Sequence, residues 1–457
     1  MNDLIIDCFA GGGGASVGIE MALGCPVDIA INHDPDAILM HKTNHPDTLH
    51  LTEDIFKVNL KKYVKGQHVA LMWASPDCTS HSKAKGGKPR EKGLRILPWA
   101  VYKHAKAILP DVIIMENVEE IQQWGPLDEK GYPVKERKGE EYEKFIIAMK
   151  SLGYAFDSRE LVAADYGAPT TRKRWYAIFR RDGKEIVWPA QTHNKEGSHG
   201  LKPWEPIWKY LDLNDYGRSI FGRKKSLAEK TMSRIAKGLD KFIFQCDSPF
   251  VMPVKTHASF GVAKLTGSRH ITAMSFLTKF YKSGTGQAMQ EPLHTITTSP
   301  GHFGQVSMLA VNRKELLKFG VDEETARKCT WVSQFIMEYY GCGTGQSISG
   351  PLHTIVSKDR FALMTILGNQ YVILDIFLRM LNPEELKRGQ GFPEDYIINR
   401  DYTWKPYPIA KQVARIGNSV VPIMAQKLVE ANCPYLKVGE RVPNLRVDDS
   451  QPQLKFA

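Results

Sequence analysis

The chain has 457 residues, of which 42% are hydrophobic and 24% charged, and it carries a formal net charge of +11. This length and composition fit a soluble globular protein of two or three domains. They exclude a membrane protein, because no apolar run approaches the roughly 18–20 residues that a bilayer span needs. The basic balance suggests a polyanionic partner, although a merely soluble basic protein is equally open.

The chain starts without a basic leader, and an apolar run at residues 4–6 meets Asp7 almost at once. We therefore expect no signal peptide and a protein that stays in the cytoplasm. The 7 cysteines are scattered and form no CxxC pair. This spacing argues against a zinc site and against a disulfide framework.

Residues 1–184 alternate between apolar strands and helix-like segments. Leu4–Phe9 predicts a first strand, Ala15–Leu23 a helix and Val27–Asn32 a second strand. Further apolar runs lie at residues 70–74, 112–115 and 175–179. Continuous apolar runs are typical of strands covered on both faces. We expect an α/β domain with a doubly wound, mostly parallel sheet that binds ligands at the carboxyl ends of its strands.

Residues 185–375 are richer in Gly, Ser, Thr and aromatic residues, and part of this region is repeated. Gly284–Gln287 with Pro292–Ile296 recurs as Gly343–Gln346 with Pro351–Ile355, and the preceding aromatic residues recur as well. Those aromatic pairs are Phe276 with Phe335 and Tyr281 with Tyr340. Two copies are too few for a solenoid, so we expect a separate β-rich domain with two related units. Residues 376–457 look helical and are expected to return to the first domain.

A glycine turn, Gly11–Gly14, stands between the first strand and the first helix. Glycines at such a place let the backbone approach a ligand closely, but a tight structural turn is the alternative. The second strand ends at Asn32–Pro35, where α/β domains often hold a ribose. Asp54 follows the next short segment and could accept a hydrogen bond from an adenine amino group, with a solvated turn as the alternative.

Cys78 directly follows the apolar run at 70–74, in a loop that we expect to be exposed. The basic residues that follow it favour the reactive thiolate and also suit phosphates. These residues are Lys83, Lys85, Lys88 and Arg90. A partly buried, inert loop thiol is the alternative.

Two other polar elements flank buried strands. Glu116 follows the run at 112–115, where burying a carboxylate is costly unless it has a charged or hydrogen-bonding partner or a functional role. Arg172 and Arg174 alternate along the chain that enters the run at 175–179, so they should point to opposite sides. One of them can then reach a base or a cofactor while the other supports the fold.

In this order, the elements resemble the cytosine-5 DNA methyltransferase family of bacterial or prophage type, over nearly the whole chain. Asp7–Gly14 is similar to the family's cofactor loop, Pro76–Cys78 to its Pro-Cys nucleophile loop and Glu116–Val118 to its Glu-Asn-Val. The other matches are Arg172–Arg174 with Arg-x-Arg, Gln390–Pro393 with Gln-Gly-Phe-Pro, and Gly417–Pro422 with Gly-Asn-Ser-Val-x-Pro. The last two elements are the most specific.

The resemblance implies a class I methyltransferase fold, S-adenosylmethionine as cofactor, and methylation at C5 of a cytosine flipped out of duplex DNA. It assigns attack on C6 to Cys78, contact with N3 to Glu116 and contact with O2 to Arg174, with Arg172 supporting the nucleophile loop. The cofactor contacts that it implies are Phe9, Ala10, Gly11, Gly13, Gly14, His33, Asp54, Ile55, Pro76, Asn418 and Val420.

The same resemblance implies a target-recognition domain at residues 185–375 and a DNA-closing loop from Ser80 to about Ile96. Within residues 218–241, 8 Lys or Arg are expected to contact phosphates, with a solvated helix face as the alternative. The residues that we expect at DNA are Ser80, Lys83, Lys85, Lys88, Arg90, Arg223, Lys224 and Lys225. The repeated polar residues Gln287, His294, Gln346 and His353 are favoured as structural turns over readers of base edges.

Four positions depart from the family pattern. Asp77 stands in place of proline and Thr170 in place of glutamine, and His33 and Asn32 stand where a carboxylate and a hydrophobic residue commonly hold the ribose and the adenine. None of them removes a reacting group, so we expect an active enzyme, without a metal and as a monomer. The alternatives are an RNA (tRNA) cytosine-5 methyltransferase of the same fold, which usually carries a smaller insert, and a catalytically weak DNA-binding relative. A cognate restriction endonuclease that acts separately stays open as a partner, in a bacterial cell or a phage-infected host.

Overall fold

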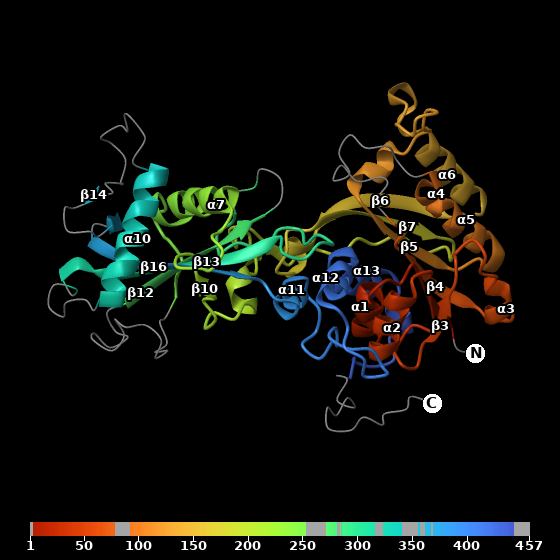
Figure 1. Ribbon diagram of the computed structural model, residues 1–457. Helices are drawn as coiled ribbons and strands as arrows, with labels where there is room; N and C mark the ends of the chain where they lie inside the picture. The colour runs from red at the N-terminus through yellow and green to blue at the C-terminus, as the bar shows by residue number, and fades with distance from the viewer. Residues whose placement is uncertain are drawn as a thin grey trace. The chain divides into compact units, whose positions relative to one another are not determined.

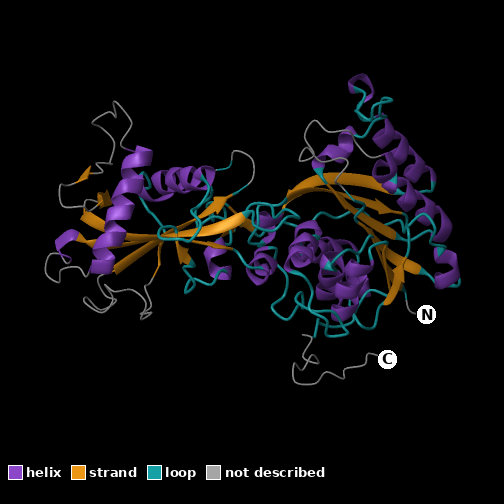
Figure 2. Cartoon of the chain, viewed as in Figure 1, coloured by secondary structure: helices purple, strands orange, loops and turns teal. Residues whose placement is uncertain are grey.

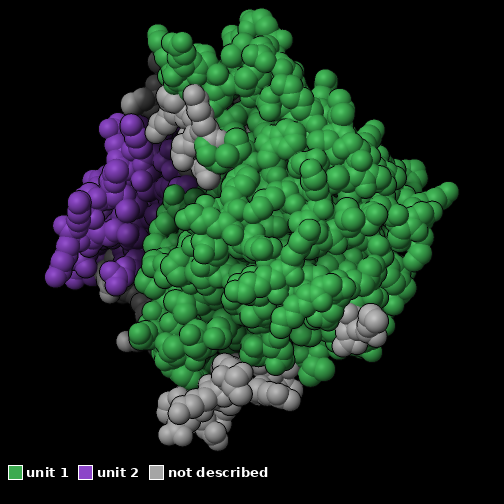
Figure 3. All heavy atoms as spheres, turned by 90° about the vertical axis from the view of Figure 1, so that its right-hand side faces the viewer, with its two compact units in different colours: residues 1–205, 294–300, 386–457 green, residues 206–293, 301–385 purple. Residues whose placement is uncertain are grey.

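The computed structural model describes residues 3–77, 92–252, 271–280, 284, 286–314, 316, 323–340, 355–356, 362–366 and 369–442. The chain divides into two compact units, which Figure 3 colours separately. Unit 1 comprises residues 1–205, 294–300 and 386–457, and unit 2 comprises residues 206–293 and 301–385. Within the described part of the chain, no helix has the length and apolar character that crossing a membrane requires.

Unit 1 is built on a sheet with the strand order β3-β2-β1-β4-β5-β7-β6 (Figure 1). Its strands are β1 (Leu4–Cys8), β2 (Ile29–Asn32), β3 (Leu49–Thr52), β4 (Val69–Ala74), β5 (Val112–Asn117), β6 (Ala155–Val162) and β7 (Lys173–Arg180). β3, β2, β1, β4 and β5 run parallel to one another, whereas β7 is antiparallel to both β5 and β6. This confirms the predicted doubly wound, mostly parallel sheet. The strand order reverses between β1 and β4, and ligands bind at such switch points.

Helices cover both faces of this sheet, because successive strand residues point to opposite sides. Ile6 and Ile113 lie in one buried cluster with residues of α5 and α6, and Ile5 and Ile114 lie in the other with residues of α1 and α13. Figure 2 shows the helices packed around these strands. The helices of unit 1 are α1 (Gly14–Leu23), α2 (Pro35–Asn44), α3 (Leu60–Val64), α4 (Lys92–Arg95), α5 (Leu97–Ile108), α6 (Glu140–Ser151), α12 (Ile409–Asn418) and α13 (Pro422–Asn432). Helix α11 (Pro383–Gly389) begins at the end of unit 2 and continues into unit 1.

Unit 2 centres on an antiparallel sheet with the order β11-β12-β13-β16-β15-β14, and β10 also pairs with β16. Its strands are β10 (Arg218–Ser219), β11 (Val251–Met252), β12 (Ile271–Lys279), β13 (Phe303–Asn312), β14 (Ile355–Val356), β15 (Ala362–Ile366) and β16 (Asn369–Met380). Helices α7 (Glu229–Leu239) and α10 (Glu323–Tyr340) contribute buried residues to the cluster on one face of this sheet. The second domain is therefore β-rich, as predicted.

The edges of the two units differ from the boundaries 184/185 and 375/376 that we expected. Residues 185–205 belong to unit 1, where the Trp204 indole donates to Asp165 and the Thr192 backbone N–H donates to the Asp165 carbonyl. Strand β16 continues to Met380, past the expected helical return, because it pairs with β13 along its length. The middle of the chain is also split, since residues 294–300 pack in unit 1.

The repeat does not extend into two equivalent β-rich units. Phe276 lies in strand β12, whereas its counterpart Phe335 lies in helix α10, so the segments ahead of the two copies have different secondary structure. Both side chains are buried in the same cluster, which explains why an aromatic residue suits each place. Gln287 is 1% exposed and donates to the Pro292 carbonyl at 3.0 Å, so it supports its own turn. Gln346 and His353 lie outside the described residues.

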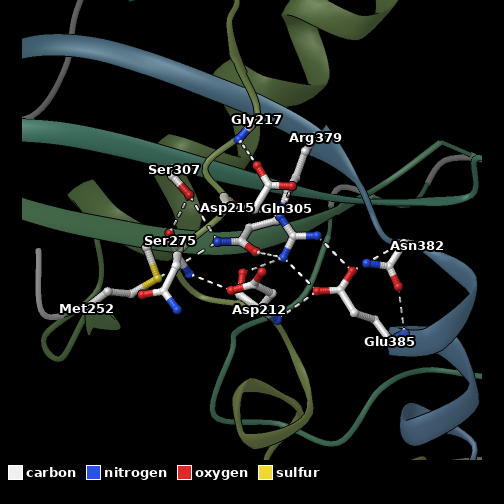
Figure 4. Close-up of polar contacts among 11 residues, drawn as sticks. Asp212, Asp215, Gly217, Met252, Ser275, Gln305, Ser307, Arg379, Asn382 and Glu385 are labelled. Atoms are coloured by element: carbon white, nitrogen blue, oxygen red, sulfur yellow. Dashed lines mark hydrogen bonds and ion pairs between the residues drawn. The ribbon is translucent and has the colours of Figure 1, made fainter. Parts of the chain in front are cut away.

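A buried ion pair ties β16 to Glu385 within unit 2 (Figure 4). Nη1 and Nη2 of Arg379 each donate to the Glu385 carboxylate at 2.7 Å, and Nη2 also donates to Gln305 at 2.6 Å. Glu385 accepts in addition from the backbone N–H of Asp212 at 2.8 Å. Arg379 is 7% exposed and Glu385 is 0% exposed, so neither charge can be balanced by water.

We expect Glu385→Gln to destabilise the protein by about 3–5 kcal/mol, because it removes the carboxylate that accepts from both Nη atoms of the buried Arg379. The exposed Asp215 carboxylate, 4.0 Å from Nε of Arg379, compensates this loss only weakly. Urea denaturation followed by circular dichroism measures the change. The matched control is Glu394→Gln, which removes the exposed partner of Arg388 and should cost less than about 1 kcal/mol. Equal midpoints for both variants would contradict the assigned role of the buried pair.

Candidate active site

A pocket of about 530 Å³ opens in unit 1 at the carboxyl ends of the parallel strands. We call it the strand-end pocket. Its walls come from the loops after β1, β2, β3 and β4, from the end of β5 and from the α12–α13 turn. The lining residues are Phe9–Gly12, Ala15, Ile31–Asp34, Glu53–Ile55, Ser75–Asp77, Leu97, Glu116, Arg172, Arg415 and Asn418–Val420. A volume of this size suits a small organic ligand.

The glycine turn forms one wall of the pocket and turns the chain sharply from β1 into α1. Phe9, Gly11 and Gly13 all have positive φ, at 66°, 54° and 88°. Gly13 and Gly14 do not line the pocket, although we expected both to contact the cofactor. Instead they allow close packing, since a Cβ on Gly14 would lie 2.2 Å from the Val420 carbonyl oxygen. Gly14 thus lets the β1–α1 turn approach the α12–α13 turn, whereas a Cβ on Gly13 would lie 2.2 Å from the Tyr396 hydroxyl.

The corner after β2 holds an ion pair that we did not predict. Asp34 caps α2, where its Oδ1 accepts from the backbone N–H of Asp36 at 2.9 Å, and its Oδ2 pairs with Arg415 of α12. Burial opposes ionisation of Asp34, but Arg415 and the two α2 N–H groups outweigh it and hold the pKa below its usual value. His33 lines the same corner. Asp34 followed by Pro35 is a readable cap signal, whereas no local pattern links Asp34 to Arg415.

Asp54 and Ile55 line the pocket after β3, together with Glu53. The Oδ1 atom of Asp54 accepts from the backbone N–H of Phe56 at 2.9 Å, which fixes the turn. The carboxylate is exposed, so its second oxygen can accept a hydrogen bond from a ligand. Both interpretations of Asp54, as a turn acid and as a ligand acceptor, are compatible with this geometry.

Glu116 ends β5 in the pocket and is nearly buried. Its carboxylate lies 3.2 Å from Nε of Arg174, whose side chain is 14% exposed. The next residue, Asn117, is fully buried and its Nδ2 donates to the Pro76 carbonyl at 3.0 Å. Asn117 therefore fixes the loop that follows β4 relative to Glu116. Sequence reasoning treated Asn117 only as part of a motif, and its place directly after a buried strand was the available signal.

The two arginines ahead of and within β7 have different surroundings. Arg172 lines the pocket, is 4% exposed, and donates from Nη1 to the Gly417 carbonyl at 3.0 Å. It thereby ties the start of β7 to the end of α12. Arg174 is not among the pocket-lining residues, and it contacts Glu116 instead.

Several residues expected at the site lie outside the described part of the chain. They are Cys78, Ser80, Lys83, Lys85, Lys88 and Arg90. The described chain reaches the pocket at Pro76 and Asp77, so position 78 directly follows a pocket wall. Of the other expected cofactor contacts, Phe9, Ala10, Gly11, His33, Asp54, Ile55, Pro76, Asn418 and Val420 line the pocket.

The three basic residues of unit 2 that we expected at DNA have different surroundings. Arg223 is half-buried and donates from Nε to the Ser219 carbonyl at 2.6 Å and from Nη2 to the Arg218 carbonyl at 2.9 Å. Lys224 and Lys225 are exposed. Arg223 therefore supports the β10 turn, whereas the two lysines present their charge to solvent.

The sheet and the strand-end pocket define an α/β protein with a cavity where the strand order reverses, which is the usual place of ligand binding in such folds. Residues 4–432 match the sequence model of the C-5 cytosine-specific DNA methylase family, and the chain belongs to this family. It is therefore a DNA (cytosine-5)-methyltransferase.

Similarity to individual known proteins is distant. The chain is 28% identical to the Type II methyltransferase M.AquIA of Picosynechococcus sp. over 200 residues. The aligned region covers 42% of this chain and 78% of that protein. It is 22% identical over 461 residues to the Type II methyltransferase M.Sau3AI of Staphylococcus aureus, and this alignment covers 92% of this chain and 95% of that protein. Among solved structures, a putative DNA modification methyltransferase encoded within an E. coli prophage has 19% identity and a TM-score of 0.42, covering 95% of this chain and 99% of that one.

We expect Gly14→Ala to destabilise unit 1 by roughly 1–3 kcal/mol, because the new Cβ collides with a backbone carbonyl that cannot rotate away. Differential scanning calorimetry measures the change in melting temperature. Gly93→Ala is the matched control: it also adds a methyl group to a helical glycine, but its Cβ meets no atom of the described residues within 4 Å. A Gly14→Ala protein that melts with the wild type would contradict the close approach of the two turns.

Proposed function

We propose that this chain transfers the methyl group of S-adenosylmethionine to C5 of a cytosine within a specific duplex DNA sequence. The observation that carries the proposal is the position of Glu116. It lines the same pocket as Pro76 and Asp77, which lead into Cys78, and Asn117 fixes that loop through Pro76. A thiol and a carboxyl are the two groups needed to activate a pyrimidine ring, and Cys78 follows Asp77 in the sequence.

The strand-end pocket fits S-adenosylmethionine. The turn at Phe9–Gly12 is short of side chains, and a Cβ on Gly12 would approach Cβ of Arg415 to 3.1 Å and Oγ of Ser419 to 3.3 Å. A side chain there would fill the space beside α1, whose N-terminal N–H groups suit a carboxylate. Ile31 and Ile55 offer apolar surface to a purine ring, and Asp54 an acceptor for its amino group. We propose Phe9, Ala10, Gly11, His33, Asp54, Ile55, Pro76, Asn418 and Val420 as cofactor contacts, with Gly13 and Gly14 shaping the turn.

When bound, the cofactor supplies an electrophilic methyl group on a sulfonium. The thiolate of Cys78 attacks C6 of the cytosine, and the ring becomes nucleophilic at C5. Glu116 hydrogen-bonds N3 and limits the charge that develops on the ring. We propose that Arg174, whose Nε lies 3.2 Å from Glu116, contacts O2. Arg172 supports the site through Gly417, at the start of the turn that carries Asn418.

Methylation of C5 in a duplex requires the base to leave the helical stack. We propose that residues 80–96, with Ser80, Lys83, Lys85, Lys88 and Arg90, close over the DNA, and that unit 2 recognises the sequence. The exposed lysines 224, 225, 230, 237 and 241 gather in one segment of unit 2 and are suited to phosphates. Arg223 contributes indirectly by supporting the turn ahead of Lys224.

We propose that the enzyme acts as a monomer on DNA in the cytoplasm of a bacterial cell or a phage-infected host. The net charge of +11 favours a polyanionic partner. Because the related proteins are named Type II methyltransferases, we also propose a separate restriction endonuclease of the same specificity.

Covalent trapping tests the proposed nucleophile. We expect a duplex that carries 5-fluorocytosine at the target to form a stable adduct with the wild-type enzyme and S-adenosylmethionine, because the C5 fluorine cannot leave as a proton does. Mass spectrometry of the digested adduct should locate the DNA on Cys78, and Cys78→Ala should bind DNA without forming it. Glu116→Gln should lower kcat about 10²–10⁴-fold, whereas Glu119→Gln, at an exposed partner of Lys173, should leave it unchanged. An adduct on another residue would overturn the assignment.

The lysines of unit 2 are tested by salt dependence. We expect Lys224→Gln with Lys225→Gln to reduce the slope of log K against log salt by about 0.9 for each phosphate that the variant no longer neutralises. Binding should weaken equally for cognate and unrelated duplexes, because phosphate contacts carry no sequence information. Fluorescence anisotropy with a labelled duplex from 50 to 300 mM salt, roughly the range where such effects are large, gives the slope. Lys61→Gln with Lys62→Gln, on exposed α3 of unit 1, is the matched control. An unchanged slope in the unit 2 variant would exclude these lysines from the DNA interface.

A further inference from the structure

A line of polar side chains leads from the base of the glycine turn toward the surface of unit 1. Asp7, the residue two before Phe9, is 0% exposed, and the Ser16 hydroxyl lies 2.7 Å from its Oδ2. Nε2 of His41 lies 2.9 Å from the Ser16 hydroxyl, and Nδ1 of His41 lies 2.9 Å from Nε2 of His50. Asp7 and His41 are buried, whereas His50 on β3 is partly exposed. We call these four side chains the Asp7–His50 relay.

The hydrogen bonds of the relay can be arranged in two ways. When Asp7 is protonated, Asp7 donates to Ser16, Ser16 to Nε2 of His41, and Nδ1–H of His41 to His50. When Asp7 is ionised, every bond reverses: His50 donates to Nδ1 of His41, Nε2–H of His41 to Ser16, and Ser16 to Asp7. Conversion from the first state to the second passes one proton along each step and releases one proton to water from Nδ1 of His50. The charge of Asp7 therefore sets the tautomer of His41.

We propose that the Asp7–His50 relay ionises Asp7 when a cationic ligand enters the strand-end pocket, and so makes the affinity for the sulfonium cofactor depend on pH. This inference rests on the proposed function. Asp7 leads directly into the pocket wall at Phe9–Gly12, and the Tyr396 hydroxyl donates to the Gly12 carbonyl at 2.6 Å. A positive ligand favours the carboxylate over the neutral acid through Coulomb attraction, which is weakly screened in a buried setting.

Burial sets the operating range of this relay. Burial raises the pKa of Asp7 to about 7. The hydrogen bonds from the Ser16 side chain and backbone lower this pKa, but their effect is smaller than that of burial. Burial also lowers the pKa of His41 well below its usual value and that of His50 to about 4, with His45 adding to both shifts. Both rings are thus neutral near pH 7, so each can pass a proton on.

Other titratable groups face Asp7 and the relay from each packed element. They are Cys8 on β1, Glu20 on α1, Lys42 and His45 on α2, and Tyr396 after α11, with Arg441 beside Tyr396. Burial raises the pKa of Cys8 and of Tyr396 far above neutrality, so neither changes charge in this range. Nδ1 of His45 lies 3.2 Å from the Glu20 carboxylate, on the side of α2 that faces α1.

The sign of the effect follows from the charge of Asp7. Above about pH 7 Asp7 is ionised before the ligand binds, and below it binding must expel a proton. Affinity for S-adenosylmethionine should fall as the pH falls through 7, by roughly tenfold if binding lowers the pKa of Asp7 by one unit. Affinity for S-adenosylhomocysteine, which lacks the sulfonium charge, should change much less.

Isothermal titration calorimetry of the full chain with both ligands between pH 6 and pH 8 tests the inference. The ratio of the two affinities should rise several-fold with pH in the wild type. It should be flat in Asp7→Asn, which keeps an acceptor for Ser16 but cannot ionise. The matched histidine control is His68→Gln, because His68 pairs with Asp3 and Asp111 away from the relay and its loss should leave the ratio unchanged.

A second measurement uses the wild-type protein alone, so it does not depend on whether a variant folds. ¹⁵N NMR of the wild-type histidines should show His41 change from the Nδ1–H to the Nε2–H tautomer as the pH rises through 7. A flat affinity ratio in the wild type, or one His41 tautomer throughout, would overturn the relay alone. If neither ligand bound at any pH, the proposed function would fail, and this inference with it.

Discussion

The packing of the β1–α1 turn against the α12–α13 turn is the constraint on which the strand-end pocket depends. A Cβ on Gly14 would lie 2.2 Å from the Val420 carbonyl, and a Cβ on Gly18 would lie 2.2 Å from the Pro422 carbonyl. Two backbones can approach this closely only where no side chain intervenes. Residues from the two ends of the described chain therefore form a single wall, and the pocket exists only when both are in place.

The sequence predicted the sheet of unit 1 well, because buried parallel strands are continuous apolar runs and the glycine turn marks the first crossover. Strand β6 was not readable in this way, because its residues are exposed or half-buried and form no apolar run. The antiparallel direction of β7 was not readable either. The unit boundaries were also misplaced. Residues 185–205 look like the loops of unit 2 in composition, and only contacts such as that of Trp204 with Asp165 assign them to unit 1.

The site shows the same division between local and non-local information. Most of the pocket-lining residues that were expected stand directly after a strand or a turn, where a local pattern exists. Asp34 and Arg415, and the tie from Arg172 to Gly417, join residues more than 240 positions apart, so nothing in the sequence pairs them. The repeat gave a partly wrong picture for the opposite reason: Phe276 and Phe335 share burial, although one lies in a strand and the other in a helix.

The contribution of Asn418, Ser419 and Val420 to the pocket wall has a consequence for synthesis on the ribosome. Phe9 and Asp34, which follow β1 and β2, and Glu116 at the end of β5 emerge early, but the turn that completes their wall is translated only after all of unit 2. A nascent chain can thus assemble the sheet while it still lacks a closed cavity. A polypeptide that terminates within unit 2 would therefore lack one wall of the pocket.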